Sequence, residues 1–315
     1  METQSSRQQT RISLLLLLVP LFWGGAFGAA KHVITEIPSI TAAALRFGLA
    51  GLILLAVALF KSEWNLASLR LRWRGLLLMA LTGIFAYNAF FFLALRYTSA
   101  INGSLIMATT PVFMTVGAVL FLQEPWNKRL GLGLALSLAG VILVILKGSL
   151  HTLFSLTFNL GDLLFSVALI SWVVHSLIGK VVMKGVSPLF ATTVTTTVGS
   201  IPLLFWSVWE GGWGNVLAMS GQSWMEMVYM VVCATVVAFF LWNRGIHQIG
   251  ASKASMYMNL VPINAAWIAV LFYDSSIGWQ QVIGIVLVIL GVFVSTFSPP
   301  EKAKNREKAA LPAQS

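Results

Sequence analysis

Long apolar runs, each about the length of a bilayer-crossing helix, alternate with short polar segments along the whole chain. A helix that crosses the hydrocarbon core needs about 20 mostly apolar residues. Because lipid offers no partner for a backbone amide, such runs must be helices. The pattern therefore predicts an all-α integral membrane protein with ten transmembrane helices. They lie near 12–30, 40–60, 75–95, 101–122, 130–147, 160–180, 189–209, 225–246, 251–273 and 279–297.

The second half of the chain repeats the first. Segment 23–31 aligns with segment 172–180 at an offset of 149 residues, and Pro111 aligns with Pro262 at an offset of 151. Each half then holds five helices, and an odd number inverts the second half across the membrane. Such inverted repeats are found in many secondary transporters, in which substrate binds between the halves. The expected units are an N-terminal tail 1–11, a first repeat 12–147, a linker 148–159, a second repeat 160–297 and a C-terminal tail 298–315.

Composition and charge support this picture. Hydrophobic residues make up 58% of the chain and charged residues only 10%, too few to cover a soluble protein of this size. The net charge of +10 would suggest nucleic acid in a soluble protein. Here sixteen of the twenty lysines and arginines fall on the side that carries both predicted tails. By the positive-inside rule, both termini are expected in the cytoplasm. The expected partner is then the lipid bilayer, and no binding of nucleic acid is expected.

Several short motifs occur in a characteristic order. They are Trp23-Gly24-Gly25-Ala26-Phe27, Leu45-Arg46-Phe47, the segment 94–100, and Pro111 followed thirteen residues later by Glu124. In order and spacing they resemble the EamA-type carriers of the drug/metabolite transporter superfamily. The resemblance implies helices around a central cavity, alternating access, and export of a small metabolite, such as an amino acid, across the cytoplasmic membrane. It also implies a structural role for the charge of Arg46.

Uncharged polar and aromatic side chains near the middle of the spans are the candidate substrate contacts. Such groups suit a neutral or zwitterionic metabolite, although they also suit ordinary helix packing. His175 leaves three roles open: a substrate contact, a proton carrier, or a neutral histidine bonded between helices. The candidates are Trp23, Tyr87, Asn88, Thr109, Thr110, Trp172, His175, Thr235, Tyr257 and Asn259.

Prolines, glycines and charges at particular positions carry structural expectations. Pro111 and Pro262 occupy matching mid-span positions and are either hinges or fixed bends. Arg46 lies near a span end, from which a long basic side chain can reach the interface, and its role is either structural or a substrate contact. Glu124 lies just ahead of the fifth span, where a helix N-terminus stabilises negative charge. Close helix contact is expected at Gly24, Gly25, Gly28, Gly133 and Gly140.

What the chain lacks narrows the function further. No carboxylate lies in the middle of a predicted span, which argues against the proton-driven export of lipophilic cations that small multidrug carriers perform with an intramembrane glutamate. No phosphate-binding loop, metal-ligand spacing or nucleophile with a base is found, so no enzyme, cofactor or metal is expected. The alternatives are a nucleotide-sugar or phosphate-ester exchanger, a membrane-embedded enzyme or sensor, and a channel. The protein is expected to be a monomer.

Overall fold

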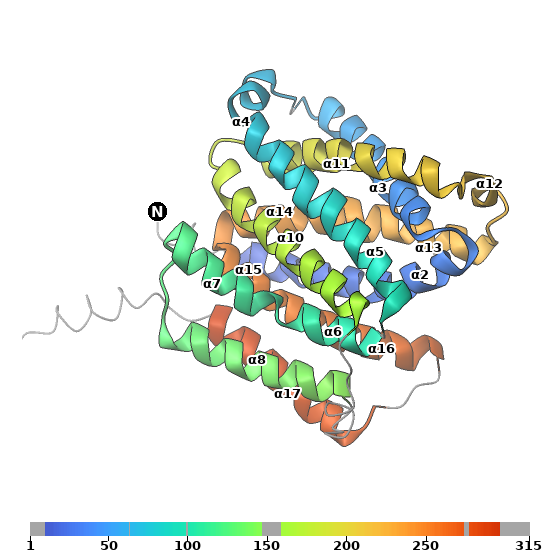
Figure 1. Cartoon of the computed structure of the whole chain (residues 1–315). Coiled ribbons are helices and arrows are strands. Elements are labelled where there is room, and N and C mark those ends of the chain that lie inside the picture. The colour runs from blue at the N-terminus through green and yellow to red at the C-terminus, as the bar shows by residue number, and fades with distance from the viewer. Residues whose placement is uncertain (1–9, 63, 99, 147–158, 274–276, 297–315) are drawn as a thin grey trace, which may run out of the picture.

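In the computed structural model, the described residues are 10–62, 64–98, 100–146, 159–273 and 277–296. Within these ranges every regular element is a helix (Figure 1). The predicted all-α fold is therefore confirmed. The predicted linker, apart from Asn159, and the predicted C-terminal tail lie outside the described residues, as does the N-terminal tail before Thr10.

Nine helices of the described residues are long and apolar enough to cross a membrane. The ninth predicted span, 251–273, is not one continuous helix, so unbroken helices do not reach the predicted count of ten. It consists of α15 (Ala251–Met256), the 3-10 helix η3 (Tyr257–Leu260) and α16 (Val261–Tyr273). The cause is local, because Pro262 has no amide hydrogen to donate to the preceding turn.

The helices of the two halves follow one another in the same order. The first half contains α2 (Leu18–Glu36), α3 (Ser39–Phe60), α4 (Leu66–Met79), η1 (Ala80–Ala86), α5 (Tyr87–Tyr97), α6 (Ala100–Ala108), α7 (Thr110–Leu122) and α8 (Lys128–Leu146). The second half contains α10 (Leu160–Val182), α11 (Pro188–Glu210), α12 (Trp213–Val216), α13 (Gly221–Val231), η2 (Val232–Val237), α14 (Ala238–Ile249), α15, η3, α16 and α17 (Trp279–Thr296).

Both halves interrupt their helices at matching places. The π-helices η1 and η2 lie in the third predicted span of each half, and their last residues are 151 positions apart. The α6–α7 break precedes Pro111, and the break between α15 and α16 precedes Pro262. Interruptions of this kind occur frequently at functional sites, and broken helices typically form the substrate sites of transporters.

Turns and exposed tryptophans mark the two ends of the bundle. In Figure 1 the α3–α4, α7–α8 and α10–α11 turns lie at the left, and the α2–α3 turn and α12 lie at the right. Trp64 and Trp126 are exposed in the α3–α4 and α7–α8 turns, Trp209 is exposed at the end of α11, and Trp279 is exposed at the start of α17. Two such aromatic belts are typical of a protein that crosses a bilayer.

Glycine permits the tight packing of α8 on α17. A Cβ atom at Gly140 would lie 2.5 Å from the carbonyl oxygen of Gly284, and one at Gly133 would lie 2.5 Å from that of Gly291. Backbone atoms leave no room at that distance, so the close contact expected at Gly133 and Gly140 is confirmed. The two contacts are repeat counterparts, and they join the last span of each half.

Candidate functional site

A cavity of about 290 Å³ lies between the two halves of the protein. Its volume is at the lower end of the range for small-molecule sites, roughly 300–1,000 Å³. Most of the wall is aromatic or aliphatic, and none of the lining residues is acidic. The larger side chains in the wall are those of Trp23, Phe27, Lys31, Arg46, Tyr87, Asn88, Phe91, Leu95, Met107, Trp172, Phe239, Met258 and Val261.

Two repeat counterparts, Trp23 of α2 and Trp172 of α10, meet in this wall. Their ring centroids are 5.4 Å apart in an edge-on arrangement, and Tyr87 lies 5.1 Å from Trp172. Equivalent residues of two halves can touch only near the axis that relates the halves. The cavity therefore lies beside the pseudo-symmetry axis of the protein, where inverted-repeat transporters place their substrates.

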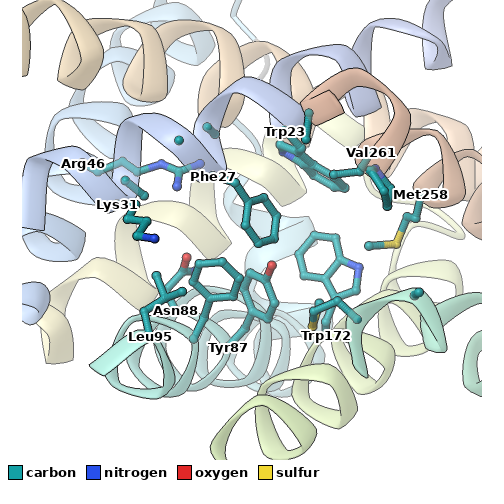
Figure 2. A pocket seen from close by; sticks show the side chains of 18 of the residues that line it. Trp23, Phe27, Lys31, Arg46, Tyr87, Asn88, Leu95, Trp172, Met258 and Val261 are labelled. Atoms are coloured by element: carbon teal, nitrogen blue, oxygen red, sulfur yellow. The ribbon is translucent and has the colours of Figure 1, made fainter. Parts of the chain in front are cut away.

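The polar groups of the cavity gather at one side of it. Figure 2 shows the Arg46 guanidinium and the Lys31 ammonium on the same side, with Asn88 beside Lys31. Trp172, Met258 and Val261 lie on the opposite side. The cavity is therefore amphipathic, with a cationic side and an apolar side.

Arg46 does not extend to the interface, contrary to expectation. Its side chain is buried and joins α3 to the π-helix η2 of the other half. Nε donates to Thr235 Oγ1 at 2.8 Å, and a terminal nitrogen donates to the carbonyl oxygen of Ala234 at 3.3 Å. That carbonyl also accepts the Trp23 indole N–H at 3.0 Å. Arg46 thus links the two halves and forms part of the cavity wall.

Four of the ten candidate substrate contacts line the cavity, namely Trp23, Tyr87, Asn88 and Trp172. The other six lie outside its wall. Thr109 and Thr110 donate to backbone carbonyls one turn earlier, and Thr235 accepts from Arg46. The remaining three are buried between helices: His175, Tyr257 and Asn259.

His175 lies one turn away from the cavity wall. Its ring stacks on Trp172, with centroids 5.2 Å apart and the planes 17° from parallel. Nδ1 donates to the carbonyl oxygen of Met79 at 2.9 Å, immediately before the π-helix η1. The described geometry is thus that of a histidine bonded between α10 and the third span.

The predicted hinge prolines differ in their surroundings. Pro262 lines the cavity, whereas Pro111 is buried at the start of α7. Both lie directly after a helix interruption.

Glu124 caps a different helix from the one expected. Its carboxylate accepts from the backbone N–H groups of Ala251 at 2.8 Å and Ser252 at 3.1 Å. These groups begin α15 of the other half, not α8. The sequence places Glu124 next to α8, and only the folded chain brings α15 to it.

Two other cavity residues share a helical face with residues already singled out. Phe27 and Lys31 follow Trp23 by four and eight residues, which places all three on one side of α2. This spacing could have identified them from the sequence. Gly28 also lines the cavity, and a Cβ atom there would meet nothing within 4 Å. The expected close helix contact at Gly28 is therefore wrong, whereas Gly24 does pack closely, with its Cβ position 2.8 Å from Asn264.

Comparison with known proteins agrees with this architecture. The model of the EamA-like transporter family matches residues 10–146 and 159–297, once for each half. The chain belongs to this family. An uncharacterized transporter of Bacillus subtilis, YyaM, is 33% identical over 90% of this chain and 93% of its own length. An uncharacterized transporter of Archaeoglobus fulgidus is 28% identical over 91% of this chain and 98% of its own.

The EamA-type fold also appears among solved structures. A crystal structure with 17% sequence identity superposes with a TM-score of 0.76 and covers 91% of this chain and 98% of the other. The protein is thus a multi-pass membrane transporter with the two-repeat EamA fold.

Proposed function

We propose that this EamA-type protein is a secondary transporter that exports a small metabolite, such as an amino acid or a related compound, by alternating access. The cavity beside the pseudo-symmetry axis is the proposed substrate site. In this mechanism the two halves exchange conformations, so that the cavity opens first to one side of the membrane and then to the other.

The observation that carries this proposal is an asymmetry between two equivalent lysines. Lys180 of α10 donates to the carbonyl oxygens of Ile246 and His247 at 2.9 Å each, at the end of α14. Its counterpart in the first half is Lys31 of α2. In the described residues Lys31 makes no such contact; it is exposed and lines the cavity.

This asymmetry is expected if the structure represents one of the two conformational states of a transporter built from two equivalent repeats. The bond of Lys180 to α14 closes the bundle at the left end of Figure 1, while the Lys31 end stays accessible. In the other state, Lys31 would donate to the equivalent carbonyls of Leu95 and Arg96, and Lys180 would be released. A channel needs no such pair of states.

The distribution of basic residues supports one orientation of the transporter in the membrane. At the left end of Figure 1 lie the start of α4, the start of α8 and the turn after α10, which carry Arg70, Arg72, Lys128 and Lys184. The ends of α2 and α5, which carry Lys31 and Arg96, lie at the right end. By the positive-inside rule, the left end is proposed to face the cytoplasm of a cell membrane. The described conformation would then be open to the outside.

Transport in a reconstituted system tests the proposal. The purified full-length protein is placed in liposomes, and uptake of radiolabelled amino acids, nucleosides, sugars, phosphate esters and carboxylates is measured with and without a pH gradient. We expect saturable uptake of at least one solute, absent from protein-free liposomes. Uptake that is non-saturable for the whole panel would contradict the proposal.

A further inference from the structure

The cavity holds two cations that lack a protein counter-ion among the described residues. The ion pairs among the described residues are His32–Glu226 and Arg96–Glu210. Neither pair involves Lys31 or Arg46. A buried charge is costly in a membrane protein unless an opposite charge compensates it. Arg46 is only 8% exposed, and its hydrogen bonds to Thr235 and Ala234 are to neutral oxygens.

The carboxylates at the same end of the bundle are already occupied elsewhere. Glu36 accepts from Ser220 and Ser223, and Glu210 accepts from Thr41 in addition to Arg96. Glu226 accepts from His32 and Gln222. Asp162 accepts from Thr98 and from the backbone of Asn159. None of these four acids lines the cavity.

The other side of the cavity favours an apolar group. Trp23, Trp172 and Met258 contribute broad apolar surfaces there. The indole N–H of Trp172 has no hydrogen-bond partner in the described structure. A ligand that spans the cavity therefore meets cations at one end and mostly aromatic rings at the other.

We propose that the substrate is an amphipathic organic anion: a monocarboxylate on an aromatic or aliphatic body, with no free ammonium group. The carboxylate supplies the missing counter-ion of the buried Arg46 and pairs with the exposed Lys31, and the body of the substrate fills the apolar side. This proposal rests on the proposed transport function and narrows it to those relatives of amino acids that lack the amine. A free ammonium group would lie in a cavity without an acid and near two like charges.

The apolar wall also argues against sugar-containing phosphate esters. A polyhydroxylated body would need many hydrogen-bond partners, and the side opposite the cations offers few. The two cations alone do not separate a carboxylate from a phosphate, so the experiment compares both groups on the same ring.

Binding to the purified full-length protein tests the charge requirement directly. Equilibrium dialysis in detergent measures the affinity for 3-phenylpropionate, phenylalanine, phenethylamine, 3-phenylpropanol and 2-phenylethyl phosphate, which share a phenyl ring and differ in charge. We expect 3-phenylpropionate to bind at least about tenfold more tightly than 3-phenylpropanol and phenethylamine, because these two lose a charge-assisted contact worth about that factor. Phenylalanine should bind more weakly because its ammonium group meets two like charges and no acid. The phosphate decides between the two anionic groups, and we expect it to bind more weakly than the carboxylate. Equal or tighter binding of phenylalanine, phenethylamine or the phosphate would overturn the proposal.

Variants test which residues recognise the anion. Lys31→Gln is expected to weaken binding of 3-phenylpropionate about tenfold and to leave 3-phenylpropanol unchanged. Lys184→Gln, which removes an exposed lysine from the opposite end, serves as the matched control and is expected to change neither. Arg46→Lys keeps the positive charge and Arg46→Gln removes it, so the first should bind the anion better than the second. If Arg46→Gln does not fold, the binding of 3-phenylpropionate to Lys31→Gln alone tests whether the cavity cations recognise the carboxylate.

One acid, Asp274, directly follows α16 in the sequence and lies outside the described residues. If it were the counter-ion, Asp274→Asn would strengthen binding of 3-phenylpropionate, and that result would overturn the proposal. We expect no change. Flux is measured separately in liposomes: anion binding without flux of any solute would contradict only the transporter function. Flux of phenylalanine without anion binding would contradict only the substrate class.

Discussion

Replacing Lys180 by methionine tests whether its contact with α14 holds one end of the transporter shut. The lysine donates to two carbonyl oxygens at 2.9 Å each. A hydrogen bond from a charged donor contributes about 1.5–3 kcal/mol. Because the Lys180 side chain is only partly buried, water can replace part of that gain. We therefore expect a net loss of about 1–2 kcal/mol, which changes the ratio of closed to open molecules roughly 5- to 30-fold.

A buried cysteine reports this shift. Cys233, the only cysteine, is first replaced by serine. Ser176→Cys then places a thiol four residues before Lys180, at a fully buried position that accepts from the Trp242 indole at 3.3 Å. In detergent, a maleimide should label this thiol roughly 5- to 30-fold faster after Lys180→Met.

The control for this assay is Lys184→Met, which removes an exposed lysine at the same end of the bundle. It should leave the labelling rate unchanged. An unchanged labelling rate after Lys180→Met, or equally faster labelling after Lys184→Met, would contradict a closing role for the Lys180 contact.

The remaining predictions concern the cavity, a helix contact and the buried histidine. Gly28→Trp fills open space in the cavity, so it should abolish solute binding and flux without lowering the melting temperature. The control Gly214→Trp, on an open part of the surface, should leave binding, flux and the melting temperature unchanged. Gly140→Leu forces α8 away from α17 and should destabilise the protein by about 1–3 kcal/mol or more, measured as a lower melting temperature in detergent. His175→Gln retains a donor for Met79, so the pH profile of flux should stay unchanged; a lost response to the pH gradient would make His175 a proton carrier.

The sequence was sufficient for the fold and for part of the site. Apolar runs and the repeat offset led to the helical membrane architecture, and mid-span position identified Trp23 and Trp172, which line the cavity. Helical spacing from Trp23 would also have identified Phe27 and Lys31. Lys31 was missed because a basic residue near the end of a span was counted as part of a loop.

Contacts between the two halves could not be predicted from the sequence. Arg46 reaches Thr235 across 189 positions, and Glu124 reaches Ala251 across 127. Local charge patterns suggested an interfacial arginine and a cap on the adjacent helix. Both expectations failed for the same physical reason: polar groups inside a membrane protein bind the nearest backbone or side-chain partner in space, and the folding of two repeats together determines that partner.

Counterflow in liposomes tests the central claim, alternating access through the cavity, most directly. Liposomes containing the protein are loaded with unlabelled 3-phenylpropionate, diluted, and given a trace of the labelled compound outside. A carrier that exchanges one solute for another transiently accumulates the label above its outside concentration, and we predict such an overshoot for the wild type and none for Gly28→Trp. If the label only equilibrates, for this solute and for every other member of the panel, alternating access through this cavity is contradicted.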